Sequence, residues 1–124
     1  MTLDSRLATL VDAARSKKAF RIRVVDVNEI ASFTNTFAFM SGGSDRQNRA
    51  IAEAIEEALK LTGERVISRE GEANGNWVLL DYGDLVVHVM DEDTRRHYNL
   101  EGLWSAGLEL ELPAEVHPES AARP

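Results

Sequence analysis

The sequence predicts an α+β domain in which helices pack on a mixed five-stranded sheet. Two kinds of segment support this prediction. Some have apolar residues at steps of three and four, the period of an amphipathic helix, and others are short β-branched or aromatic runs typical of strands. They follow one another as helix, two strands, helix, three strands and helix, within 124 residues, a length that suits one domain.

The composition excludes several functions. The chain has no cysteine, so disulfides, thiolate zinc sites and a cysteine nucleophile are excluded, and a cytoplasmic setting is expected. Its 21 acidic and 14 basic residues give a net charge of −7, which repels a phosphate backbone, so we expect little or no direct binding to nucleic acid. No apolar run approaches the roughly 20 residues that span a bilayer, and we expect no membrane contact.

The N-terminal third is predicted to form one helix and two strands. Leu7, Leu10 and Val11 lie on one face of a helix over 3–18. Residues 20–27, FRIRVVDV, alternate apolar side chains with arginine before a continuous apolar patch, which is typical of a half-exposed strand. A second strand over 36–41 is β-branched and aromatic, and a pair of glycines ends it.

A helix from Asp45 to about Thr62 has the clearest local signal. Ser44 and Gln47 have the spacing of a capping box, in which each side chain satisfies a backbone N–H at the start of a helix. Gly63 is placed to take the left-handed conformation that ends this helix. Its buried stripe is predicted to consist of Ile51, Ala54, Ile55, Ala58 and Leu59.

The C-terminal half has three runs typical of strands: 64–70, 77–81 and 85–90, with a loop over 71–75. The acidic residues 91–93 favour the start of a final helix that runs towards Trp104. From Glu109 onward the chain is acidic, contains prolines and has little to bury. We therefore expect residues 109–124 to be a disordered acidic tail and residues 1–108 to be the single domain.

The hairpin between the last two strands has two possible registers. A two-residue turn at Tyr82-Gly83 pairs Leu80 with Leu85 and makes one face of the hairpin entirely aliphatic. The other face then carries Trp77, Leu79, Asp81, Val86, His88 and Met90, a mixture too apolar for idle exposure. A three-residue loop with Gly83 in a bulge avoids a positive φ at Tyr82 and moves Trp77 to the aliphatic face. Both registers stay open.

The Gly42-Gly43-Ser44 step between a strand and a helix has two interpretations. It could offer a helix N-terminus to a phosphate. We favour the alternative, in which the glycines make the turn and Ser44 caps the helix, because no lysine stands in a P-loop position. The same step resembles the opening of a nucleotidyltransferase site, but that chemistry needs paired carboxylates on the next strand, and residues 65–69, RVISR, supply none.

Titratable residues give no strong catalytic signal. Asp81 and Asp84 could hold a hard cation or act as an acid–base pair, yet aspartate is also a favoured turn residue and no third ligand is in reach by sequence. His88 lies in a strand, where a lone histidine is more often a sheet-face residue than a base, and the three histidines have no metal-ligand spacing. We expect no catalytic residue, no metal and no cofactor.

Four large aromatic residues gather in the last third of the chain: Trp77, Tyr82, Tyr98 and Trp104. Core packing explains each of them singly, and we favour it for Trp104, which is expected to dock the last helix on the sheet. As a set they lie around one hairpin and one helix among acidic residues. Aromatic rings beside a polar rim are typical of a protein-binding hot spot.

Several stretches taken together resemble the ribosomal silencing factor family, also called the Iojap family. They are Lys18-Ala19, Val25-Asp26-Val27, SGGSDRQ over 41–47, WVLLDYGD over 77–84, Val87-His88-Val89 and YNLEGLW over 98–104. The departures from the family's pattern are Gly43 for threonine, Met90 for phenylalanine, His97 for an aromatic residue and Gly102 for a long side chain.

The resemblance implies a translational repressor and not an enzyme. Members of the family bind the large ribosomal subunit through its universal protein fourteen and thereby prevent the small subunit from joining, an activity associated with starvation and stationary phase. Their fold is nucleotidyltransferase-like without the catalytic carboxylates. Two other interpretations stay open, a divergent enzyme with the nucleotidyltransferase fold and a module whose role is to form a homodimer.

The predicted partner-binding residues are apolar, aromatic and polar side chains of the hairpin and the final helix. The set consists of Trp77, Leu79, Asp81, Tyr82, Asp84, His88, Met90 and Tyr98. In this hypothesis the large rings and Leu79 are anchors, while Asp81 and Asp84 pair with lysine or arginine of the partner. Ribosomal proteins are generally basic, so the net negative charge would steer the domain towards such a partner.

Overall fold

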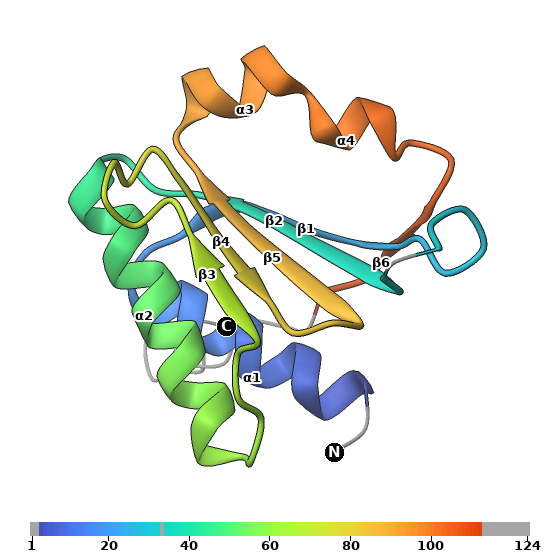
Figure 1. Ribbon diagram of the computed structural model, residues 1–124, viewed down its shortest axis with the longest axis horizontal. Coiled ribbons are helices and arrows are strands. Elements are labelled where there is room, and N and C mark those ends of the chain that lie inside the picture. The colour runs from blue at the N-terminus through green and yellow to red at the C-terminus, as the bar shows by residue number, and fades with distance from the viewer. Residues whose placement is uncertain (1–2, 33, 113–124) are drawn as a thin grey trace, which may run out of the picture.

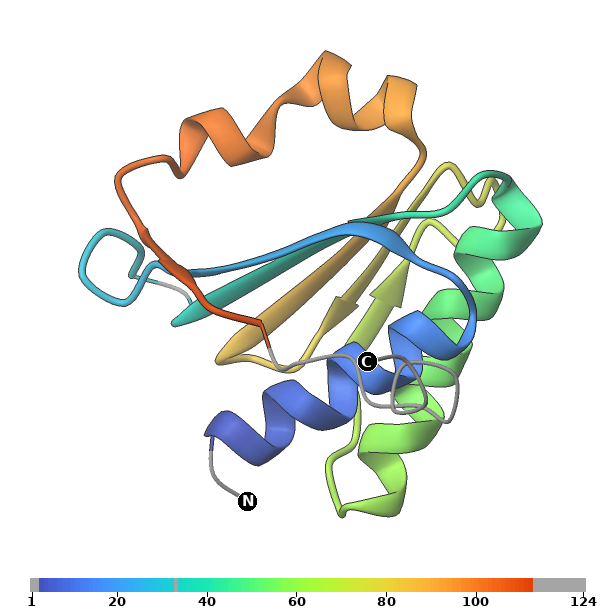
Figure 2. The same cartoon turned by 180° about the vertical axis from the view of Figure 1, so that it is seen from behind.

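The computed structural model describes residues 3–32 and 34–112 as two helical layers around one sheet (Figures 1 and 2). The helices are α1 (Leu3–Ser16), α2 (Asp45–Leu61), α3 (Glu92–Tyr98) and α4 (Leu100–Leu103). The strands are β1 (Phe20–Asp26), β2 (Thr36–Ser41), β3 (Ser68–Glu70), β4 (Trp77–Asp81), β5 (Leu85–Met90) and β6 (Leu108–Leu110). Helices α1 and α2 cover one face of the sheet, and α3 and α4 lie over the other.

The sheet has six strands in the order β3-β4-β5-β2-β1-β6. Strands β2 and β5 are parallel, and the other neighbouring pairs are antiparallel. The predicted α+β class with a mixed sheet is therefore confirmed, with one strand more than expected. Within the described ranges, no helix has the length and apolarity that crossing a bilayer requires.

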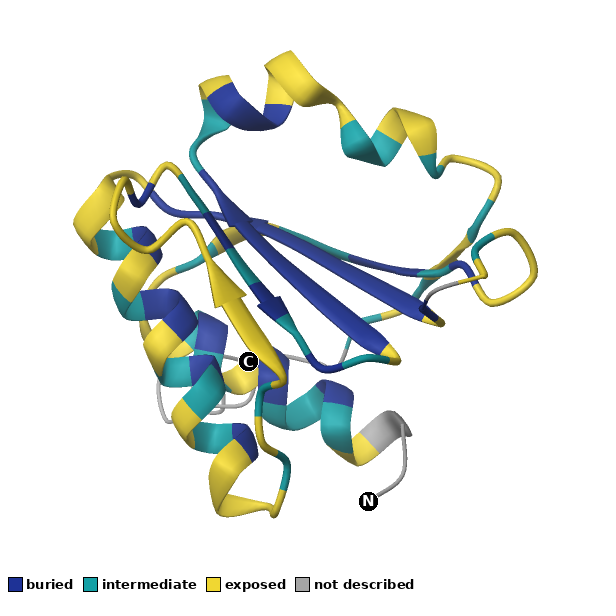
Figure 3. Ribbon diagram, viewed as in Figure 1, coloured by how far each residue is buried: buried dark blue, intermediate teal, exposed yellow. Residues whose placement is uncertain are grey.

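Apolar side chains lie on both faces of the sheet, and Figure 3 shows that its central strands are buried. The first core layer lies between the sheet and the helices α1 and α2, and it includes Leu10, Val24, Met40, Ile51, Ile55, Leu59, Val78, Leu80, Val87 and Val89. The second core layer lies on the opposite face, and it consists of Val25, Val27, Phe37, Phe39, Val86 and Met90, with Trp77, Leu79, Leu100 and Trp104 partly buried against it. Strands β2 and β5 contribute to both layers, and every residue of each is buried.

Helix α2 begins and ends as its sequence predicts. The Ser44 hydroxyl accepts from the Gln47 N–H at 3.0 Å, and the Gln47 side chain accepts in return from the N–H of Gly43 at 2.7 Å. Gly63 has a φ of +93° directly after the cap residue Thr62. In the predicted stripe, Ile51, Ile55 and Leu59 are buried and the two alanines are half-buried, while Asn48 and Ala52 complete the buried face.

The predicted strand over 64–70 is shorter in the structure, where only Ser68–Glu70 pairs with β4. The N–H of Ile67 donates to the carbonyl of Asp81 at 2.7 Å, but residues 64–66 connect α2 to this edge without strand structure. All three residues of β3 are exposed. An exposed segment of this kind has few apolar contacts to extend its pairing, which explains the early end of the strand.

The predicted final helix is two helices. Asn99 is left-handed, with φ 46° and ψ 49°, and it is both the C-cap of α3 and the N-cap of α4. Its side chain accepts from the N–H of Gly102 at 3.3 Å. Asparagine tolerates the left-handed conformation better than most residues, so the chain turns here and α4 continues along the sheet in a new direction.

The prediction of disorder from residue 109 is wrong for the segment that follows α4. Residues Leu108–Leu110 form β6, antiparallel to β1, with Leu110 opposite Val24. Leu110 and Leu112 pack against the first core layer, and Glu109 forms an ion pair with Arg23. The predicted tail over 113–124 lies outside the described residues and stays a prediction.

We predict that Gly71→Ala destabilises the fold by about 3 kcal/mol or more, because its new Cβ would lie 1.8 Å from the carbonyl oxygen of Trp77 at a φ of +84°. Gly63→Ala is the matched control, since its φ is +93° but nothing lies within 4 Å of the new Cβ. It should cost only about 1 kcal/mol. Chemical denaturation measures both, and equal losses would contradict the close approach of the 71–75 loop to Trp77.

Candidate partner-binding surface

The β4–β5 hairpin turns one residue later than the predicted two-residue turn at Tyr82-Gly83, and it does not have the predicted three-residue loop. Asp81 pairs with Val86, the N–H of Tyr82 donates to the carbonyl of Leu85 at 2.8 Å, and Gly83 and Asp84 form the connection. Both predicted turns are therefore wrong. In the observed pairing, Leu80 is opposite Val87, two residues beyond the Leu85 that the Tyr82-Gly83 turn predicts. Side chains along a strand alternate between the two faces of the sheet, so a shift of two residues leaves each side chain on its predicted face. The faces predicted from that turn are therefore the observed ones.

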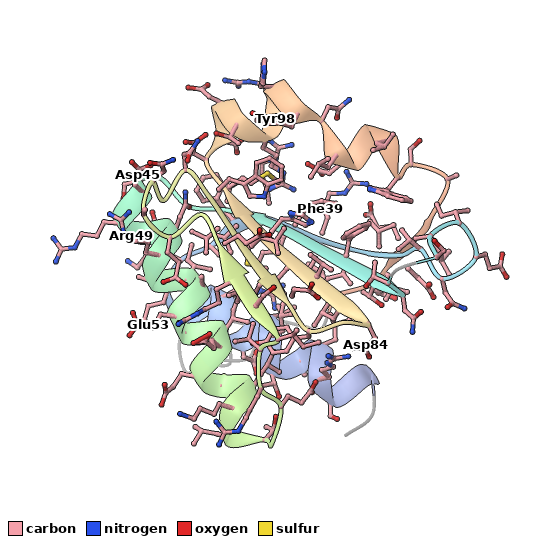
Figure 4. The ribbon with its side chains drawn as sticks, in the orientation of Figure 1. Phe39, Asp45, Arg49, Glu53, Asp84 and Tyr98 are labelled. Carbon is pink, nitrogen blue, oxygen red and sulfur yellow. The ribbon has the colours of Figure 1, made fainter. Side chains whose placement is uncertain are left out.

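An aromatic surface lies where β4 meets α3. Trp77 and Leu79 are half-buried on the outer side of the second core layer, and the Trp77 indole packs against the ring of Tyr98 with centroids 4.9 Å apart. Tyr98 is 56% exposed, and Figure 4 shows it on α3 above the sheet. We call Trp77, Leu79 and Tyr98 the aromatic patch.

Carboxylates lie beside the aromatic patch on the same face of the sheet. Asp81 follows Leu79 by two residues on β4, and Glu70 on β3 is paired in register with Leu79. Asp81 is half-buried, and its Oδ1 accepts from the N–H of Gly83 at 2.7 Å, so it also has the turn role that the sequence suggested. Glu70 is exposed and was not predicted as a site residue, because the strand pairing that places it here is not visible in the sequence.

His88 lies beneath the aromatic patch. Only 4% of it is exposed, and its Nδ1 accepts a hydrogen bond from the Trp77 Nε1–H at 3.1 Å. Its ring stacks on Phe39 with centroids 5.2 Å apart and an interplanar angle of 17°. Burial lowers the pKa of His88 to about 4 because the charged imidazolium loses its hydration.

Three predicted site residues are buried: Tyr82, His88 and Met90. Tyr82 belongs to the first core layer and is 7% exposed, with the Arg6 guanidinium 6.0 Å from the centre of its ring. Burial, together with the nearby carboxylates Glu56 and Glu64, raises the pKa of Tyr82 to about 12. The expectation that Tyr82 is a surface anchor therefore disagrees with its position, and His88 and Met90 are also out of reach of a partner at the surface.

Asp84 is at the opposite end of the hairpin from Tyr98 (Figure 4). Its carboxylate accepts two hydrogen bonds from Arg6, at 2.6 and 2.9 Å, and Arg6 also forms an ion pair with Glu64 at 2.8 Å. The hydrogen bonds from Arg6 lower the pKa of Asp84. Asp84 therefore ties the hairpin turn to α1 and is not part of the aromatic patch.

A buried arginine holds the α3–α4 layer to the sheet. Arg95 is 2% exposed, and it donates to the Ser41 hydroxyl at 2.9 Å and to both carboxylate oxygens of Glu101. Arg23 on β1 also donates to Glu101, at 2.7 Å. Burial acts to raise the pKa of Glu101, but the hydrogen bonds and charges of the two arginines outweigh it and lower that pKa. Sequence periodicity did not reveal this cluster, since its members come from four separate segments.

Trp104 completes the second core layer. Its indole centroid lies 5.2 Å from that of Phe37. This contact between the end of α4 and β2 confirms the predicted docking role of Trp104. Among residues 3–32 and 34–112, no three histidine, aspartate or glutamate side chains are grouped so that they could hold a metal ion.

The chain is in the class of small α+β domains with a core layer on each face of one sheet. It presents aromatic rings and carboxylates where β4 meets α3. A family model described as "Ribosomal silencing factor during starvation" matches residues 1–124. The chain therefore belongs to the ribosomal silencing factor family, as the resemblance of its motifs predicted.

Individual relatives agree with this assignment. A protein of Halalkalibacterium halodurans named ribosomal silencing factor is 34% identical over 116 residues, which cover 94% of this chain and 99% of that protein. A crystal structure of a Chromobacterium violaceum protein has a TM-score of 0.81 at 30% identity and covers 95% of this chain and 98% of that one. A mouse protein named "Mitochondrial assembly of ribosomal large subunit protein 1" is 31% identical over 99 residues, 77% of this chain and 43% of that protein.

The lowered pKa of His88 predicts a loss of stability in mild acid. In the unfolded chain an ordinary histidine takes up a proton below about pH 6.5, whereas folded His88 does so only near pH 4. Between these values protons favour the unfolded state, so the free energy of unfolding should fall by about 2 kcal/mol from pH 7 to pH 5.

Denaturation at a series of pH values measures this loss. The His88→Phe variant is the control, because it should lack the histidine part of the slope while keeping the carboxylate titrations at lower pH. The same slope in both proteins would contradict the burial of a neutral His88.

The Arg95 cluster predicts a large difference between two substitutions near α3. Glu101→Ala should cost about 3 kcal/mol of stability, because it leaves the buried Arg95 without its carboxylate partner. Arg96→Ala, which removes an exposed ion pair with Asp93 on the same helix, should cost less than about 0.5 kcal/mol. Urea denaturation compares them, and a loss below about 1 kcal/mol for Glu101→Ala would show that the cluster does not hold the layer.

Proposed function

We propose that this protein is a translational repressor that binds the large ribosomal subunit through its universal protein fourteen and blocks joining of the small subunit. Translation would thereby slow under starvation or in stationary phase. Membership of the ribosomal silencing factor family is the observation that carries the proposal. The description of that family supports starvation as the condition, and the name of the mouse relative supports the large subunit as the target.

The aromatic patch supports binding to a protein. Trp77, Leu79 and Tyr98 offer apolar contact area at the edge of a packed layer, and aromatic residues in such positions are the usual anchors of protein interfaces. A standard interface buries about 800 Å² on each partner, roughly a tenth of the 7313 Å² accessible surface here. The domain is large enough for such a contact to leave most of its surface projecting from the subunit, where it would obstruct a second large body.

The charge supports a basic partner. The net charge is −7, and Glu70 and Asp81 lie beside the aromatic patch on the same sheet face. Carboxylates at the rim of an apolar contact steer association with lysine- and arginine-rich proteins and disfavour bare nucleic acid. In this proposal Asp81 pairs with a cationic side chain of the partner, while His88 and Met90 lie beneath the surface in the second core layer, and Tyr82 and Asp84 take no part in the contact.

We expect added protein to reduce the joining of ribosomal subunits. Purified 30S and 50S bacterial subunits are mixed at a magnesium concentration that favours joined ribosomes, with and without the protein, and separated on a sucrose gradient. The protein should sediment with the large subunit and lower the joined fraction, without added nucleotide. A protein that stays at the top of the gradient and leaves the joined fraction unchanged would exclude the proposal.

Variants locate the surface. Trp77→Ala should weaken binding to the large subunit by about 2 kcal/mol or more, and Tyr98→Ala should weaken it by about 1 kcal/mol, because both remove aromatic contact area. Leu61→Ala is the matched control, since Leu61 is 82% exposed on α2 at the opposite face of the sheet. Co-sedimentation over a concentration series measures the affinities, with thermal melting to verify folding. Equal affinities for all three would place the contact elsewhere.

A further inference from the structure

His88 occupies a position that does not suit a polar side chain. Its ring packs against the rings of Phe37 and Phe39, with centroids 5.4 and 5.2 Å away, in the second core layer. The Trp77 indole N–H can only donate, so His88 Nδ1 accepts, and the proton of the neutral ring is on Nε2. That Nε2 is buried and has no hydrogen-bond partner among the described residues.

An unpaired buried donor lowers the stability of the folded state. An apolar ring in the same place would keep the contacts with Phe37 and Phe39 without leaving a polar atom unpaired. The hydrogen bond from Trp77 satisfies only the Nδ1 atom of His88 and leaves the cost of the unpaired Nε2–H in place. The stability of the fold therefore gives no reason for a histidine at this position.

The hydrogen bond fixes the orientation of the indole. Trp77 is on β4 opposite Met90, and its ring is in contact on one side with the exposed Tyr98 of α3. His88 is two pairs further along the hairpin, opposite Leu79, on the same face of the sheet, and its Nδ1 accepts from the indole N–H. Its lowered pKa keeps the ring neutral near neutral pH, so the Nδ1 lone pair is always available to the indole.

We propose that His88 is a positioning residue, which holds the Trp77 indole from within the core in the orientation that the partner-binding surface requires. His88 does not touch the partner. The rigid indole would bind with less loss of rotational freedom than a mobile one, which raises affinity without adding a contact. This inference rests on the proposed function, in which Trp77 is an anchor for a component of the large ribosomal subunit.

The variant His88→Phe tests the proposal, because it keeps an aromatic ring against Phe37 and Phe39 and removes the acceptor. We expect its unfolding midpoint to equal or exceed that of the natural protein. Its affinity for purified large ribosomal subunits should fall by about 3- to 10-fold, the value of one hydrogen bond. His88→Leu, with a smaller side chain, is the second apolar variant should the larger ring crowd the core.

Two further measurements separate positioning from a general disturbance. In nitrogen-15 NMR spectra of the free protein, the Trp77 indole N–H should exchange with solvent faster in His88→Phe, with Trp104→Phe used to assign the two indole signals. In a Trp77→Phe background, which has no indole donor, His88→Phe should cause no further loss of affinity. His88→Asn, which restores an acceptor near the Nδ1 position, should recover part of the affinity although it leaves a cavity and lowers stability.

The outcomes are distinguishable. An unchanged affinity in both apolar variants overturns the proposal, and so does an equal loss of affinity with and without the Trp77 indole. If the natural protein itself fails to bind large subunits, the proposed function fails first. The exchange of the indole N–H still decides in that case whether His88 restrains Trp77, because it is measured without any partner.

Discussion

Strands β2 and β5 are buried on both faces, and this constraint determines the arrangement of the other elements. A strand with apolar side chains on both faces needs cover above and below the sheet. The long helices α1 and α2 provide it on one side. On the other side the chain has only the short helices α3 and α4, which are largely polar and have few buried residues. The helices α3 and α4 therefore cover the second core layer with little apolar surface.

A buried ion pair compensates for this shortage of apolar cover. Arg95 reaches from α3 to Ser41 at the end of β2 and to Glu101 on α4, and Arg23 connects the same carboxylate to β1. Each of these bonds has a defined direction, so the cluster fixes where the two helices lie, whereas a small apolar contact alone would allow them to slide. The cover extends over Phe37 and Phe39, and it leaves Trp77 and Leu79 at its margin. The aromatic patch is thus a consequence of an incomplete layer.

Sequence patterns predicted what depends on local spacing. The capping residues Ser44 and Gln47 and the alternation of the hairpin strands placed α2, β4 and β5 correctly. The two predicted registers put Trp77 on opposite faces of the sheet, and the alternation alone did not choose between them. The wrong predictions concern residues whose structure depends on contacts with segments far away in the sequence. The pairing of Leu110 with Val24 on β1 makes a strand of a short segment that looks like tail, and the burial of Tyr82 depends on the helices that cover it.

The candidate site was predicted in part for the same reason. Trp77, Leu79 and Tyr98 could be chosen as surface residues because large rings near acidic residues are costly to leave exposed without a partner. Nothing in the spacing of residues showed that His88 would accept a hydrogen bond from Trp77, or that Asp84 would turn towards Arg6. Both contacts join segments through side-chain geometry, which a one-dimensional pattern does not contain.

The aromatic patch and the core beneath it place opposite demands on position 88 of the chain. The core favours an apolar ring there, since the rings of Phe37 and Phe39 pack against this position. The surface favours a hydrogen-bond acceptor at position 88, because the Trp77 indole lies at the margin of the α3–α4 layer. Its single N–H donor can be held in one orientation only by an acceptor. A neutral imidazole meets both demands in part, because its ring stacks on Phe39 and its unprotonated Nδ1 accepts a hydrogen bond. On the proposal that His88 positions Trp77, the histidine gives up a last increment of core stability for the orientation of the surface ring.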